Sequence, residues 1–94
     1  MKAQNVQLRK NQLSLSGQQS KMLLLHAFGQ WIKQNRKSLG WTKRKAAKEA
    51  GIDLNHWISI ELGLTSESRS TVLLVSRTVQ ADKKEALRRY RLLF

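Results

Sequence analysis

Four cationic side chains fall within seven residues of the segment 42–51, which reads TKRKAAKEAG. They are Lys43, Arg44, Lys45 and Lys48. The segment that follows, IDLNHWISIELG, holds two acids and no lysine or arginine. Phosphate groups are bound by such cations, whereas base edges are read by uncharged polar and apolar side chains. This division of charge predicts that the first segment contacts phosphate and that the second, which lacks cations, has a different role.

The whole chain is strongly basic, with 18 Lys+Arg against 6 Asp+Glu and a net charge of +12 over 94 residues. A balance of this kind favours a polyanionic partner, with nucleic acid ahead of an acidic membrane surface or an acidic protein. The longest apolar run, residues 22–28, is far shorter than the roughly 20 residues that span a bilayer. We therefore expect no membrane partner and a cytoplasmic, nucleoid-associated location.

The residues that could support catalysis are few. The chain has no cysteine, which excludes disulfides, thiolate chemistry and cysteine-built zinc sites. His26 and His56 are the only histidines, and no cluster of carboxylates accompanies them in the sequence. We expect no catalytic site, no metal and no cofactor, and hence no enzyme.

Helices must position these side chains, since apolar residues recur at intervals of three and four. The pattern predicts an all-α domain over residues 20–94, with helices over about 20–39, 42–50, 53–62, 70–79 and 82–93. Thr42, Asp53 and Asp82 are expected as N-caps, and Gly51 and Gly63 as helix stops. In the third helix the inward positions are Trp57, Ile60 and Leu64, and the outward positions are Leu54, Asn55, Ile58 and Ser59.

Residues 1–19 form a basic N-terminal arm that holds three cations and no acid. Its polar composition predicts disorder in isolation. The alternation LSLS at 13–16 also suggests a short strand able to pair with another chain. A third alternative is that the arm enters the minor groove of DNA.

Many positions resemble the helix-turn-helix domain of the phage repressor and Cro (XRE-like) family, over roughly residues 28–79. The matching residues are Arg36, Gly40, Trp41, Thr42, Lys43, Ala47, Gly51, Ile52, Asp53, Ile60, Glu61 and Gly63. The resemblance implies a five-helix fold in which the second helix crosses the phosphate backbone and the third lies in the major groove. It also implies a structural ion pair between Arg36 and Glu61. The chain departs from the family at Leu54 and Ile58, which are apolar where polar base-reading groups are usual.

The candidate DNA contacts follow from this placement. Asn55 can bond twice to an adenine edge, Leu54 and Ile58 can contact thymine methyl groups, and Ser59 can bond a base or a phosphate. The phosphate candidates are Thr42, Lys43, Arg44, Lys45, Lys48, Thr65 and Ser66.

The function that the resemblance implies is a sequence-specific regulator of transcription, a repressor or autoregulator that binds double-stranded DNA as a homodimer. The dimer contact could involve residues 82–93 or the arm. Two alternatives remain open. The first is a protein-interaction module that binds a toxin or a transcription component through Leu54, Ile58, Trp31 or the arm, and the second is RNA binding.

Overall fold

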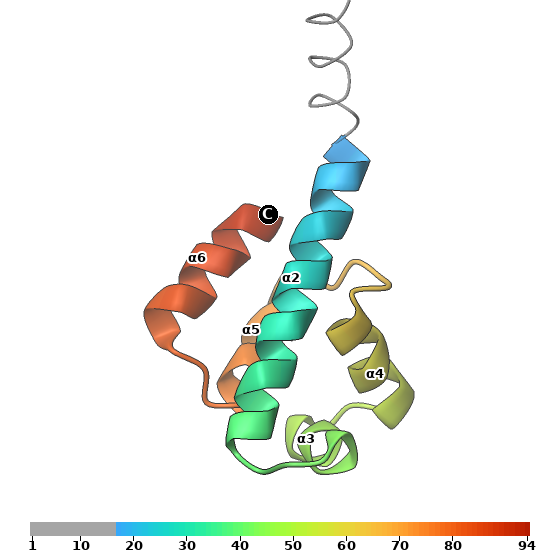
Figure 1. Cartoon of the computed structure of the whole chain (residues 1–94), viewed down its shortest axis with the longest axis vertical. Helices are drawn as coiled ribbons and strands as arrows, with labels where there is room; N and C mark the ends of the chain where they lie inside the picture. Colours follow the sequence, from blue (N-terminus) through green and yellow to red (C-terminus); the bar gives the residue numbers. More distant parts are fainter. Residues whose placement is uncertain (1–16) are drawn as a thin grey trace, which may run out of the picture.

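The computed structural model describes residues 17–94, which fold into five α-helices with no strand in this range (Figure 1). The helices are α2 (Gly17–Ser38), α3 (Lys43–Ala50), α4 (Leu54–Leu62), α5 (Arg69–Thr78) and α6 (Lys83–Leu93). The expectation of an all-α fold is confirmed for these residues. The predictions for most of the arm, including the strand at 13–16, fall on residues 1–16 and lie outside the described part of the chain.

The long helix α2 forms the centre of the domain. Helices α4 and α6 contact it on opposite sides, and α3 lies near its C-terminal end (Figure 1). Helix α5 contacts both α3 and α6, and so closes the domain between them. All five helices therefore bury their apolar faces in one core, which holds α3 and α4 next to each other.

The core is built from the inward positions of each helix. Phe28 and Ile32 of α2, Trp57 and Ile60 of α4, and Val75 of α5 are all 2% exposed or less. Fully burying a side chain of this size contributes about 1.5–3 kcal/mol relative to leaving it exposed. The prediction that Trp57 and Ile60 face inward is confirmed.

Two helices begin earlier in the structure than the sequence predicts. Helix α2 begins at Gly17 rather than near residue 20, so that residues 17–19 belong to the helix and not to the arm. Helix α5 begins at Arg69 because Ser68 is its N-cap: the Ser68 hydroxyl accepts a hydrogen bond from the Thr71 N–H at 3.2 Å. The predicted starts at 42, 53 and 82 are N-cap residues, which directly precede the first helical residue.

At the ends of α4, one prediction is confirmed and one is wrong. Asp53 is the N-cap of α4, as predicted, with an extended backbone, although its carboxylate accepts no capping hydrogen bond. Leu64, expected to point inward, is 67% exposed. The helical spacing from Trp57 no longer applies there, because the chain leaves the helix at Gly63, whose φ of +66° is left-handed.

Candidate nucleic-acid interface

The cations of α3 lie just after a capped helix start. The Thr42 hydroxyl accepts a hydrogen bond from the Lys45 N–H at 3.0 Å and so caps the N-terminal end of α3. Arg44, Lys45 and Lys48 are exposed, and Lys43 is half-buried. Because the N-terminal N–H groups of a helix attract anions, cations placed in its first turns make this end of α3 suited to phosphate.

The four cations are not equally available. Lys45 Nζ lies 2.8 Å from Glu49 Oε1 and 5.4 Å from the centre of the Trp41 ring. The hydrogen bond and the charge of Lys45 lower the pKa of Glu49, so that the carboxylate stays ionised opposite it. Within residues 17–94, no ion pair joins Arg44 to an acid. The guanidinium of Arg44 is therefore the more available group for an external phosphate.

A turn of three residues joins α3 to α4. Gly51 has a φ of +71°, and the Ile52 N–H bonds the Ala47 carbonyl at 3.0 Å, which closes the end of α3. Ala46 and Ala47 are the buried residues of α3 and belong to the same core as Trp57. Small side chains at these two positions let α3 and α4 lie close together, with the cations of α3 left outside.

The outward face of α4 is less exposed than the sequence predicts. Asn55 is exposed, and its amide has no hydrogen-bond partner among the described residues. Leu54, Ile58 and Ser59 are half-buried. The free amide of Asn55 is thus the polar group on this face that is most available to a ligand, with partly covered apolar side chains beside it.

A buried hydrogen-bond network fixes α4 to α2. The ion pair implied by the resemblance is present: Arg36 donates to Glu61 Oε2 through Nε at 2.6 Å and to Oε1 through Nη2 at 3.1 Å. Trp57 Nε1 also donates to Glu61 Oε2, at 2.6 Å, and Arg36 Nη1 donates to the Trp41 carbonyl at 2.8 Å. Arg36 is 6% and Glu61 2% exposed. This network connects three segments of the domain, and the role of Trp57 in it was not predicted.

Two glycines bring the backbones of α2 and α4 into contact. A Cβ added at Gly29 would collide with the backbone carbonyls of Ile60 and Glu61. A Cβ added at Gly63 would lie 2.7 Å from the Cα of His26. The only sequence signal for the first contact was a glycine in the middle of a predicted helix. These contacts and the buried network hold the C-terminal end of α4 firmly against α2.

The two remaining phosphate candidates lie after α4. Thr65 and Ser66 are both exposed, but the Thr65 hydroxyl donates to Glu67 Oε2 at 2.8 Å. Glu67 Oε1 lies 2.6 Å from His56 Nε2, so the same carboxylate ties this loop to α4. His56 therefore has a structural contact that the sequence did not predict, and Ser66 is the freer of the two hydroxyls.

Within residues 17–94, no group of three or more His, Cys, Asp and Glu side chains comes together as a metal site. None of the helices in the same range is long and apolar enough to cross a membrane. Comparison with known proteins found no matching family model, no matching curated protein and no matching solved structure.

Proposed function

We propose that this protein binds double-stranded DNA through α3 and α4 and regulates transcription, as the resemblance to the repressor and Cro family implies. The observation that carries the proposal is the pairing of two adjacent helices with different surfaces. Exposed cations begin α3, and an exposed, unpaired amide lies on the cation-free helix α4. In a helix-turn-helix domain these are the surfaces that contact phosphate and base edges.

The α3 surface supplies affinity. Arg44 and Lys48 are exposed. Lys43 and Arg44 lie in the first turn of the helix, and Lys48 lies in its last turn. Each phosphate neutralised by such a group releases counterions, so binding weakens as salt rises. This contribution does not depend on sequence, and it positions the protein on the duplex.

The α4 surface supplies sequence preference. An α-helix with its side chains is about 10–12 Å across, so α4 fits the major groove, which is about 12 Å wide. Asn55 lies in the first turn of α4, the part of a recognition helix that reaches base edges. Its amide matches the donor and acceptor of adenine, and Leu54 and Ile58 beside it suit thymine methyl groups.

Arg44→Ala should weaken duplex binding more than Lys45→Ala does, although both remove one cation from the same turn. Lys45 is held by Glu49 and Trp41, whereas Arg44 is free to bind phosphate. We expect Arg44→Ala to reduce the slope of log K against log salt by about one, and Lys45→Ala to reduce it by less. Fluorescence anisotropy with a labelled random duplex over a salt series measures both slopes.

The same titration tests the proposal against its alternatives. Single-stranded DNA and RNA of equal length are run beside the duplex with the unmodified protein. The proposal expects the tightest binding to duplex DNA at every salt concentration. Tighter binding to single strands or to RNA would overturn it, as would equal slopes for unmodified protein and Arg44→Ala.

A further inference from the structure

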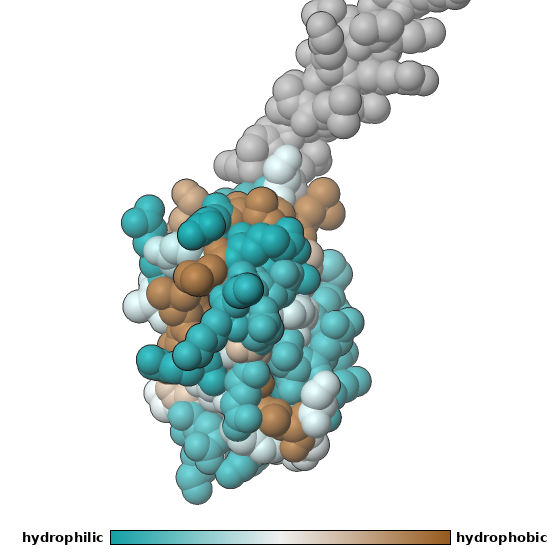
Figure 2. Space-filling model, turned by 90° about the vertical axis from the view of Figure 1, so that its left-hand side faces the viewer, coloured by the Kyte–Doolittle hydropathy of each residue, from teal (hydrophilic) through white to brown (hydrophobic). Residues whose placement is uncertain are grey.

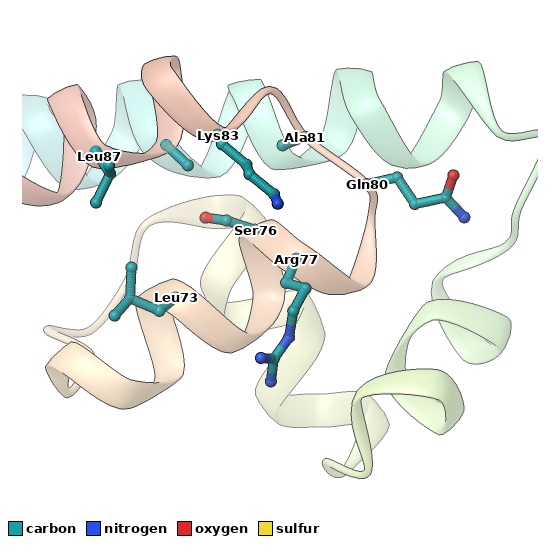
Figure 3. Close-up of a pocket in the computed structure, with 8 residues that line it drawn as sticks. Leu73, Ser76, Arg77, Gln80, Ala81, Lys83 and Leu87 are labelled. Atoms are coloured by element: carbon teal, nitrogen blue, oxygen red, sulfur yellow. The ribbon is translucent and has the colours of Figure 1, made fainter.

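A groove of about 500 Å³ lies between α5 and α6, away from α4. Its lining residues are Leu73, Ser76, Arg77, Gln80, Ala81, Lys83, Ala86 and Leu87. Figure 3 shows Leu73 and Leu87 at one end of the groove and Gln80 at the other, with Lys83 and Arg77 between them. The groove therefore combines an apolar end with a cationic middle.

The apolar part of the groove is open to solvent. Leu73 is 41% and Leu87 47% exposed, although both belong to helices whose other faces are buried in the core. The face of the molecule that includes α6 shows apolar patches surrounded by hydrophilic side chains (Figure 2). Apolar surface bounded by a polar rim is typical of a site that binds another molecule.

The charge around the groove selects the kind of molecule. Residues 69–94 carry seven cations and two acids, and the charged side chains that line the groove, Arg77 and Lys83, are both positive and exposed. Of the two acids, Glu85 pairs with Arg88 and Arg89, and Asp82 caps the start of α6. An occupant must therefore bring apolar side chains together with negative charge.

This chain does not itself supply such a segment. The arm, residues 1–19, contains cations and no acid. A second copy would bring a net charge of +12 to a cationic groove, and four of its acids, Glu49, Glu61, Glu67 and Glu85, already pair with side chains of their own chain. Like charges brought together in an interface oppose association.

We propose that the α5–α6 groove docks an acidic amphipathic helix of a partner protein. Apolar side chains on one face of that helix contact Leu73, Ala86 and Leu87, and its carboxylates pair with Arg77 and Lys83. A helix laid in an apolar groove is a common mode of peptide recognition. Because α4 and α6 contact opposite sides of α2, the groove stays accessible when α4 is occupied (Figure 1).

The proposal is tested with a fluorescein-labelled synthetic helix. It has leucine at i, i+3, i+4 and i+7, which form one apolar face, and glutamate at positions beside that face. A scrambled peptide of the same composition controls for general attraction to a basic protein. Both are titrated with the full chain and with two variants, Leu87→Ser and Leu92→Ser. These leucines are 47% and 50% exposed on the same helix, but only Leu87 lines the groove, so both variants should fold.

We expect the amphipathic peptide to bind at least about tenfold more tightly than the scrambled one, since only it presents a continuous apolar face. Leu87→Ser should remove most of this difference, and Leu92→Ser should preserve it. Arg77→Ala should weaken amphipathic binding, while the exposed control Arg91→Ala should not. Equal binding of the two peptides, or equal effects of the two leucine variants, would overturn the proposal, as would displacement of the peptide from the groove by duplex DNA.

Discussion

Glu61→Ala should lower the free energy of unfolding by about 3–5 kcal/mol, because it leaves Arg36 as a buried charge without its partner. The loss extends beyond the ion pair. Glu61 Oε2 also accepts the hydrogen bond from Trp57 Nε1, and both donors are deeply buried. Urea denaturation followed by tryptophan fluorescence measures the change.

Glu49→Ala is the matched control for this prediction, since Glu49 also pairs with a cation but at the surface. It should leave the unfolding midpoint close to that of the unmodified protein. A double replacement, Arg36→Met with Glu61→Leu, should recover part of the stability by removing both charges. Equal midpoints for Glu61→Ala and Glu49→Ala would show that the buried network does not hold α4 in place.

Gly63→Ala should lower the free energy of unfolding by about 2–5 kcal/mol. The left-handed conformation at φ +66° costs a residue with a Cβ roughly 1–2 kcal/mol. The added methyl group would also lie 2.7 Å from the Cα of His26. Relieving such a clash costs about 1–3 kcal/mol more. The expected result is a partial displacement of α4 from α2, seen as a lower thermal midpoint and weaker duplex binding.

Gly51→Ala separates the two causes. Gly51 has nearly the same φ, +71°, but a Cβ there meets no atom within 4 Å. Gly51→Ala should therefore lower the free energy of unfolding only by the cost of the left-handed conformation, roughly 1–2 kcal/mol. If Gly63→Ala and Gly51→Ala lower the free energy of unfolding equally, the contact of Gly63 with α2 is not tight enough to position α4.

Local sequence rules located the helices well. The glycines at 51 and 63 and the cap at Thr42 act within one turn of the chain, so their residue types alone indicate where α3 and α4 begin or end. Ser68 shows the limit of such rules. It lies in a serine-rich run, and only its hydrogen bond to Thr71 distinguishes it as the cap of α5.

The candidate site was less predictable because it depends on contacts between distant segments. The contact of Gly29 with the end of α4 joins residues about thirty positions apart in the sequence. Helix propensity, which depends on neighbouring residues, cannot predict such a contact. Partial burial of Leu54 and Ile58, and the 2.6 Å contact between His56 Nε2 and Glu67 Oε1, likewise follow from how neighbouring segments pack. The pairing of Lys45 with Glu49 could have been predicted from the sequence, since i, i+4 pairs of opposite charge are expected on a helix.

The central claim is that α4 reads DNA sequence while the cations of α3 supply affinity. Selection of binding sites from random duplex DNA at about physiological salt, with unmodified protein and Asn55→Ala in parallel, tests it most directly. The account predicts an enriched palindrome, as two copies on adjacent half-sites would give, and loss of preference at one position per half-site in the variant. No enriched motif, or the same motif from both proteins, would contradict it.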